Sequence, residues 1–249
     1  MQCSDCGLVY LDPWPDLSLR EKSLAYGEHQ GEKRVRTNTR YRPSLRRTYA
    51  GILDVVFEPA YFDARPVRWF DIGCGYGEFL ETLAGRVGRD SVLRGTEPNL
   101  TKQRSARARG LDVQFYDVEE MSDTFSHISM LNVFSHLPDP VSFLRLAAER
   151  LTKDGEILLQ TGNGGDVQRA DFPGGLSFPD HLIFGGRHSL EVALRAAGLE
   201  VFAITAFATP RFSLINFAKD TVKRLTQSNH NPARWGGPYR DLWVRARRA

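Results

Sequence analysis

The sequence predicts an α/β fold, with a doubly wound, mostly parallel sheet of seven strands and an antiparallel strand at its edge. From about residue 40 to residue 208, short apolar runs alternate with stretches of helical periodicity. Such alternation is typical of a parallel sheet with helices on both faces. The last two apolar runs are joined by the long segment 209–239, which favours an antiparallel pair at one margin of the sheet.

Each element is justified by its local pattern. The expected strands are short apolar runs and cover residues 67–72, 90–97, 111–116, 125–134, 156–161, 199–207 and 240–247. The expected helices cover residues 41–57, 77–87, 99–110, 139–155 and 189–198. The first helix carries apolar residues near the 3.6-residue period, at Leu45, Tyr49, Ile52, Leu53 and Val56. The fourth begins with an Asp-Pro pair and has a glycine past its expected end, which are typical helix boundaries.

The length and composition predict one large globular domain with an appendage. The 249 residues are 41% hydrophobic and 25% charged, as in ordinary soluble proteins. We expect an N-terminal segment at 1–40 and a main domain at 41–249, with loop insertions at 162–186 and 209–239. No run of 18 apolar residues and no signal-peptide pattern is present, and the cysteines number three. We therefore expect a cytoplasmic protein with no membrane partner.

A glycine-rich turn and three acidic residues, Asp71, Glu97 and Asp117, suggest a ligand pocket. The turn 73–77 follows the first expected strand of the sheet, where ligands of open α/β sheets bind, and bare backbone allows close approach. A structural turn would explain the glycines equally well on their own. However, Glu97 and Asp117 end the next two expected strands, where carboxylates can accept bonds from a ribose and from an adenine amine. Together these residues predict a nucleoside pocket.

These motifs resemble those of the class I S-adenosylmethionine-dependent methyltransferases. "DIGCGYGEFL" is similar to the first motif of that family, "GTEPN" to the second and "YDVEE" to the adenine-contacting segment. The resemblance covers about residues 65–208 and implies a Rossmann-like methyltransferase fold with S-adenosylmethionine as cofactor. It places Asp71 near the methionine amino group, Glu97 on the ribose and Asn132 beside the methyl-bearing end. The implied cofactor-binding residues are Asp71, Gly73, Cys74, Gly75, Gly77, Glu97, Pro98, Asp117, Val118 and Asn132.

Two positions depart from the family pattern. His127 stands where relatives often have aspartate, and Ser135 replaces the glutamate of the common "EHLPDP" sequence. Any role of that glutamate cannot be transferred to this chain.

Methyl transfer to a hydroxyl, an amine or an acidic carbon needs a base, and histidine titrates closest to neutral pH. The favoured candidate is His181, because "SFPDHLIFGGRHSL" resembles a segment of related methyltransferases in which a histidine faces the acceptor. The alternative is that His181 orders its loop through backbone hydrogen bonds. His136 is the second candidate, with helix capping or packing as its alternative. Tyr26, Tyr41 and Arg42 are candidates for a lid.

The N-terminal "CSDCGLVYLDP" resembles one knuckle of a small zinc ribbon that precedes some sugar and secondary-metabolite methyltransferases. Structural zinc needs four ligands, and Cys3 and Cys6 supply two. We expect no metal; the alternative is a site completed by His29 or by a partner chain.

We therefore expect an enzyme that methylates an oxygen or carbon of a small molecule, such as a sugar nucleotide or a secondary-metabolite intermediate. One alternative is an RNA or protein methyltransferase that uses the basic stretch 33–47, although we do not expect a nucleic-acid partner. Another is a non-catalytic protein that binds the cofactor. A homodimer is a candidate assembly.

Overall fold

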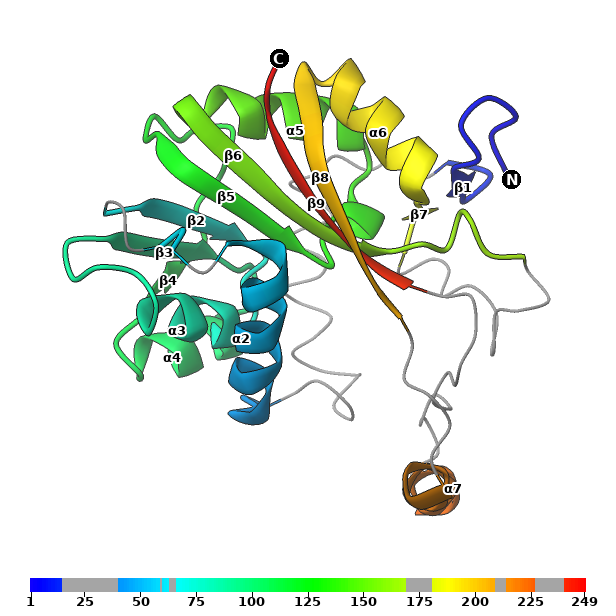
Figure 1. Cartoon of the computed structure of the whole chain (residues 1–249), viewed down its shortest axis with the longest axis horizontal. Helices are drawn as coiled ribbons and strands as arrows, with labels where there is room; N and C mark the ends of the chain where they lie inside the picture. Colours follow the sequence, from blue (N-terminus) through cyan, green and yellow to red (C-terminus); the bar gives the residue numbers. More distant parts are fainter. Residues whose placement is uncertain (15–39, 59, 63–65, 169–180, 209–213, 227–239) are drawn as a thin grey trace.

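The computed structural model describes residues 1–14, 40–58, 60–62, 66–168, 181–208, 214–226 and 240–249 (Figure 1). Its strands are β1 (Val9–Tyr10), β2 (Arg68–Ile72), β3 (Val92–Thr96), β4 (Asp112–Gln114), β5 (Phe125–Leu131), β6 (Leu151–Gly162), β7 (Ile183–Phe184), β8 (Leu199–Ala208) and β9 (Arg240–Arg248). Its helices are α2 (Ser44–Val56), α3 (Glu78–Ala84), α4 (Leu100–Arg107), the 3₁₀ turn η1 (Phe134–His136), α5 (Pro140–Glu149), α6 (Arg187–Ala196) and α7 (Leu214–Thr226). No helix within these ranges is long and apolar enough to cross a lipid bilayer.

Within the described residues, seven strands form one sheet in the order β4-β3-β2-β5-β6-β9-β8. Neighbours from β4 to β6 are parallel, and β9 is antiparallel to both β6 and β8. The predicted mostly parallel sheet with an antiparallel margin is confirmed. The antiparallel strand lies one position in from the edge, and β8, outermost, runs in the direction of β6.

The two faces of the sheet follow from the alternation of side chains along each strand. Trp69, Leu158 and Trp243 belong to the buried cluster that includes α2, α3 and α4. Their neighbours Phe70, Ile157 and Val244 belong to the cluster that includes α5 and α6. Figure 1 shows the corresponding two helical layers. Both faces are therefore buried, as the continuous apolar character of the central strands requires.

His127, one of the two departures from the family pattern, is a core residue. Its ring is buried and stacks on Trp69 at 4.5 Å between centroids. Its Nε2 lies 2.7 Å from the hydroxyl of Tyr61, and its Nδ1 lies 2.8 Å from Ser126 Oγ. These contacts explain a buried histidine at this position without any catalytic role.

The boundaries of several elements differ from those predicted. The fourth expected helix ends at Glu149 rather than near residue 155, because Leu151 pairs with Phe125 and begins β6. The strand expected at 111–116 ends at Gln114, and the one expected at 125–134 ends at Leu131. In each case long-range pairing sets the boundary, and local composition does not show it.

The N-terminal segment joins the long loop that follows β6. The two-residue strand β1 pairs antiparallel with β7, with Val9 opposite Phe184 and Tyr10 opposite Ile183. The backbone N–H of Leu11 donates to the carbonyl of Leu182 at 2.9 Å. The hairpin that carries Cys3 and Cys6 is therefore attached beside His181.

A glycine substitution tests the packing between the sheet and α3. A Cβ atom on Gly95 would lie 2.6 Å from Cys74 Sγ and 2.8 Å from Leu80 Cδ1, both in the core. We expect Gly95→Ala to lower the free energy of unfolding by roughly 1–3 kcal/mol, as for other overpacked cores. Urea denaturation measures the change. Gly88→Ala is the control, because a Cβ there meets no atom within 4 Å; equal effects of the two substitutions would contradict the prediction.

Candidate active site

The glycine loop is positioned by the end of the neighbouring strand. The N–H groups of Gly73 and Cys74 both donate to the carbonyl of Thr96, at 2.9 and 3.1 Å. Gly73, Gly75 and Gly77 have φ values of 69°, 59° and 83°, in the left-handed region that favours glycine. A Cβ on Gly73 or Gly77 would meet another side chain, whereas Gly75 faces open space. Gly75 is therefore the point of the loop where a ligand can approach the backbone.

Glu97 connects the glycine loop to β3. Its Oε2 accepts a hydrogen bond from the N–H of Gly75 at 3.0 Å, and its Oε1 accepts one from Asn99 at 2.9 Å. The side chain is 2% exposed, and burial raises its pKa, although Lys102 at 3.9 Å acts in the opposite direction. Each carboxylate oxygen has two lone pairs, so these bonds leave capacity to accept from two hydroxyl groups.

Asp71 is a second buried carboxylate in the same place. It lies within β2, directly before the loop, and is 1% exposed. Burial raises its pKa to about 7, a hydrogen bond from Ser129 lowers it, and the charge of Glu97 raises it further. Ser129 donates to Oδ1 of Asp71 at 2.5 Å and accepts from Nε1 of Trp69 at 2.8 Å. The protonation state of Asp71 is therefore poised near neutral pH.

A cavity of about 140 Å³ is lined by four of the ten predicted cofactor-binding residues, and the other six, Glu97 among them, are not in its lining. Its lining includes the predicted residues Asp71, Gly73, Cys74 and Gly75. Cys74 is buried beneath the loop, and burial raises the pKa of its thiol well above the ordinary value. It is a packing residue at this position.

The start of the main domain closes one side of this cavity. Arg42 lines it, and the N–H of Arg42 donates to Glu78 at 2.9 Å. The hydroxyl of Tyr41 donates to Glu81 at 2.6 Å. Tyr41 and Arg42, two of the three candidates for a lid, thus contact α3, and their role as a lid stays a prediction; Tyr26 lies outside the described residues. Tyr49 also lines the cavity, whereas the sequence pattern predicts it only as part of the apolar face of the first helix.

The predicted adenine-contacting segment follows β4 rather than ending it. Asp117 is half-buried, and its Oδ1 accepts from the N–H of Glu119 at 3.0 Å. The hydroxyl of Thr96 donates to the carbonyl of Tyr116 at 3.0 Å, which keeps this segment at the carboxyl end of β3. Val118 is buried there, and Pro98 directly follows Glu97.

A second cluster lies at the end of β5. Asn132 has φ 59°, and its N–H donates to the carbonyl of Gln160 at 3.0 Å, so the chain turns sharply into η1. Ser135 in η1 lies 2.8 Å from Nδ1 of His181, measured from its Oγ. The rings of His136 and His181 are 4.4 Å apart between centroids. The two predicted base candidates are therefore neighbours, and the residue that replaces the family glutamate contacts one of them.

The loop that carries His181 is held from both sides. The N–H of Leu182 donates to the carbonyl of Ser135 at 2.7 Å, and the ring of Phe184 stacks on that of His181. Asn132 connects this cluster to the cofactor cavity, because it directly follows Leu131, which lines the cavity. The next residue, Val133, would contact a Cβ on Gly73.

The cysteine pair lies in the N-terminal hairpin, where the N–H of Cys3 donates to the carbonyl of Leu8 at 2.8 Å and the N–H of Gly7 donates to the carbonyl of Cys3 at 3.0 Å. Backbone hydrogen bonds from Cys6 and Asp5 lower the pKa of the Cys3 thiol, and burial raises that of Cys6. Among the residues that the structure describes, no group of three or more His, Cys, Asp or Glu could hold a metal ion. His29, the alternative ligand, lies outside these residues.

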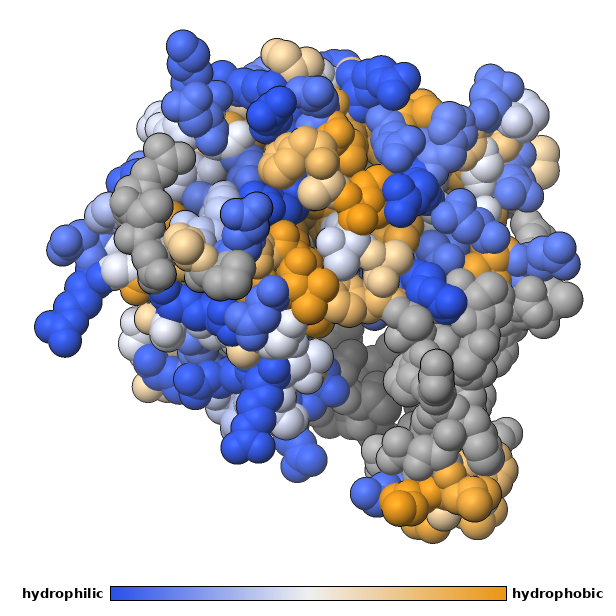
Figure 2. All heavy atoms as spheres, viewed as in Figure 1, coloured by the Kyte–Doolittle hydropathy of each residue, from blue (hydrophilic) through white to orange (hydrophobic). Residues whose placement is uncertain are grey.

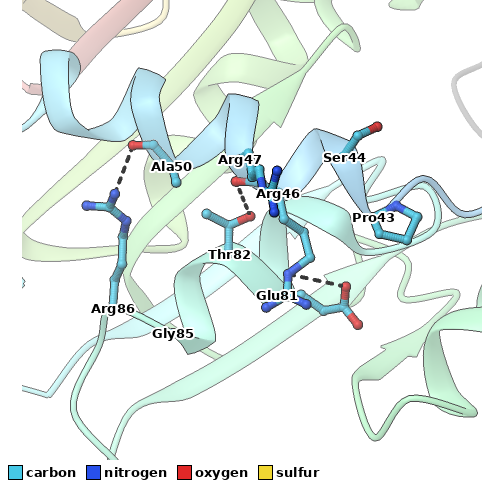
Figure 3. Close-up of a pocket in the computed structure, with 9 residues that line it drawn as sticks. All are labelled: Pro43, Ser44, Arg46, Arg47, Ala50, Glu81, Thr82, Gly85 and Arg86. Atoms are coloured by element: carbon cyan, nitrogen blue, oxygen red, sulfur yellow. Dashed lines mark hydrogen bonds and ion pairs between the residues drawn. The ribbon is translucent and has the colours of Figure 1, made fainter.

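A larger cavity, of about 670 Å³, lies between α2 and α3 on the basic stretch (Figure 3). Several of its polar residues are used in contacts between the two helices. Arg86 binds Asp54 at 2.6 Å and the carbonyl of Ala50 at 2.9 Å. Arg46 lies 4.0 Å from Glu81. The groove shares no residue with the lining of the cofactor cavity.

Comparison with known proteins decides the family. A family model described as "Methyltransferase domain" matches residues 40–204. The chain belongs to this family. A ubiquinone biosynthesis O-methyltransferase of Xanthomonas oryzae pv. oryzae is 28% identical over 150 residues, which are 56% of this chain and 62% of the relative. The chain thus spans less than two thirds of the curated relatives that it matches.

Solved structures show the same fold. A SAM-dependent methyltransferase of Archaeoglobus fulgidus has a TM-score of 0.56 at 19% identity, covering 81% of this chain and 93% of its own. The magnesium protoporphyrin IX methyltransferase of Synechocystis, with bound SAH, has a TM-score of 0.55 at 11% identity, covering 94% and 89%. The chain therefore has the fold of the class I S-adenosylmethionine-dependent methyltransferases, as the motifs predicted.

The residues present fit this cofactor. Gly75 offers bare backbone facing open space, and beside it stand two buried carboxylates, Asp71 and Glu97. Carboxylates suit the hydroxyl and ammonium donors of an aminoacyl nucleoside.

Replacing Asp71 tests its buried state. Because folding raises its pKa from 3.8 to about 7, the folded protein binds the extra proton, and the stability contributed by this site falls as the pH rises between these values. Asp71→Asn keeps an acceptor for Ser129 and removes the charge. We expect the substituted protein to gain stability relative to the wild type on going from about pH 5 to pH 8, by up to about 3 kcal/mol. Thermal unfolding at several pH values measures the difference; a constant difference would contradict the raised pKa.

Proposed function

We propose that this methyltransferase acts on a small molecule, a sugar nucleotide or a secondary-metabolite intermediate, at an oxygen or carbon atom, with His181 as the base. The observation that carries this proposal is the pair formed by His181 Nδ1 and Ser135 Oγ, 2.8 Å apart, at the end of the strand that borders the cofactor cavity.

The hydrogen bond to Ser135 suits a base. When Nδ1 carries the proton, the serine hydroxyl accepts it as a hydrogen bond and Nε2 carries the lone pair. Bound S-adenosylmethionine supplies an activated methyl group. In our proposal, Nε2 takes the proton of the acceptor hydroxyl or acidic carbon as the methyl bond forms, and the proton then leaves to water. Ser135 acts as a positioning residue, because it fixes the ring orientation and the tautomer.

The cofactor side of the proposal assigns each carboxylate one group. Asp71 faces the methionine ammonium and Glu97 accepts from the ribose hydroxyls. Both assignments rest on the family resemblance together with the burial of the two side chains next to the glycine loop.

Small-molecule acceptors are supported by the similar proteins, whose names refer to ubiquinone biosynthesis and to magnesium protoporphyrin IX. The alternative acceptor class, RNA or protein, is favoured by the groove that Arg46, Arg47 and Arg86 line. Two of these arginines already contact acidic side chains. Salt-sensitive RNA binding that is lost in Arg46→Glu/Arg47→Glu would support that alternative.

Cofactor affinity provides the first test. An ammonium group binds the ionised form of Asp71 better, so binding should strengthen as the pH rises toward the pKa of about 7. We expect the Kd for S-adenosylmethionine to fall by up to about tenfold per pH unit between about pH 5.5 and 7. Isothermal titration calorimetry measures it. Asp71→Asn should bind more weakly with little dependence on pH; equal pH dependence in both proteins would remove Asp71 from the ammonium site.

Turnover provides the second test. With a panel of sugar nucleotides and hydroxylated metabolites, release of S-adenosylhomocysteine identifies an acceptor. We then expect His181→Ala to lose about 10²–10⁴-fold in kcat while the Kd of the cofactor stays unchanged, the magnitude typical of a lost general base. Ser135→Ala should lose about tenfold in kcat, and Ser135→Thr, which keeps the hydroxyl, should recover part of it.

His188 supplies the matched control for turnover. It is an exposed histidine in the first turn of α6, so His188→Ala should keep wild-type kcat. If His181→Ala also turned over at the wild-type rate, His181 would have no part in proton transfer. A loss confined to thermal stability would assign it the loop-ordering role instead.

A further inference from the structure

Helix α7 presents an apolar surface to solvent. All five of its large apolar residues are between 47% and 83% exposed: Leu214, Ile215, Phe217, Val222 and Leu225. Figure 1 shows the helix standing apart from the sheet and its helical layers, and Figure 2 shows the apolar side chains gathered on it. Exposed apolar groups this concentrated mark an interaction site.

The helix is amphipathic and basic. Phe217, Val222 and Leu225 follow Leu214 at intervals of three, eight and eleven residues, so they share one face. The sequence of the helix contains three basic residues, Lys219, Lys223 and Arg224, against the single acid Asp220, and Lys219 is exposed. A short helix with one apolar face and an excess of positive charge suits the surface of an anionic lipid bilayer.

The position of α7 in the topology relates it to the active site. The helix lies between the end of β8 and the start of β9. Because β8 runs in the same direction as β6, its carboxyl end lies with the carboxyl ends of the parallel strands, and the glycine loop follows one of these strands, β2. The start of the antiparallel strand β9 lies at the same end of the sheet, because Asp241 pairs with Gly162 at the carboxyl end of β6. A surface bound by α7 would therefore lie on the side of the molecule from which the active site opens.

We propose that α7 binds the surface of an anionic lipid bilayer, with its apolar face among the acyl chains and its basic residues at the headgroups. If the proposed function also holds, the acceptor is an amphiphile that the enzyme takes from that surface. This inference departs from the expectation of no membrane partner, which rested on the lack of a spanning segment. A helix of 13 residues lies on a membrane and does not cross it.

A second copy of the chain fits this surface less well. One such arrangement is a two-fold symmetric pairing in which the α7 helices of two copies pack on each other. The excess of positive charge on the two helices would then be brought together. Anionic headgroups complement that charge.

Vesicle binding by the full chain, measured without any methyl acceptor, tests the proposal. We expect co-sedimentation with vesicles of phosphatidylcholine mixed with phosphatidylglycerol, much weaker binding to phosphatidylcholine alone, and weaker binding at high salt. The triple substitution Leu214→Ser/Ile215→Ser/Leu225→Ser should reduce the partition coefficient at least about tenfold. Lys219→Glu/Lys223→Glu should reduce binding to the anionic vesicles only.

The matched control removes exposed apolar residues elsewhere. Val55→Ser/Val92→Ser replaces residues that are 61% and 36% exposed on α2 and β3, and binding should be unchanged. Thermal unfolding checks that all variants fold. Absence of binding to either vesicle type would overturn the proposal, as would a dimer in light scattering that the triple substitution dissociates. Loss of turnover on a water-soluble acceptor with unchanged vesicle binding would assign α7 to the active site instead. Failure of vesicle binding leaves the proposed methylation intact, because cofactor binding and turnover are measured separately.

Discussion

The hydrogen bond between the Gly75 N–H and the Glu97 carboxylate is the constraint on which the proposed cofactor site depends. It fixes a bare-backbone loop against the end of the neighbouring strand, and it does so with a carboxylate that is almost completely buried. Burying a carboxylate is unfavourable unless hydrogen bonds compensate, and here backbone donors do so on both oxygens. Each carboxylate oxygen keeps capacity to accept a further hydrogen bond, so the side chain that makes this structural bond can also serve as a binding group.

Asp71 is a second buried carboxylate at this site, and ionising a carboxylate in such surroundings is unfavourable. Burial is the largest cause of the raised pKa of both Asp71 and Glu97, and the charge of Glu97 raises the pKa of Asp71 further. Ser129, itself anchored by Trp69, holds Asp71 in place. A cationic group of the cofactor is therefore the natural complement of the site, and the folded enzyme carries an unfavourable charge that such a ligand relieves.

The histidine cluster and α7 show how the loops around the sheet specialise a common fold. His181 and His136 come from segments that are 45 positions apart in the sequence, and Ser135 links them through a hydrogen bond and a backbone contact. The N-terminal hairpin, attached through β1 and β7, supports the loop that carries His181. The sequence predicts that hairpin only as part of a separate N-terminal segment, because a two-residue strand that pairs with residues more than 170 positions away has no local signature.

The sequence by itself determined the fold class, the order of the seven strands of the main sheet and of helices α2 to α6, and the cofactor motifs, because these follow from local periodicity and from spacing within short motifs. It could not locate the ends of β4 and β6, which depend on pairing with distant strands. It also missed Tyr49 as a cavity residue, since only the packing of α2 over the glycine loop places it there. Tertiary structure alone decided that Ser135 meets His181 and that the apolar face of α7 has no place in the core, because both depend on which surfaces the folded sheet leaves available.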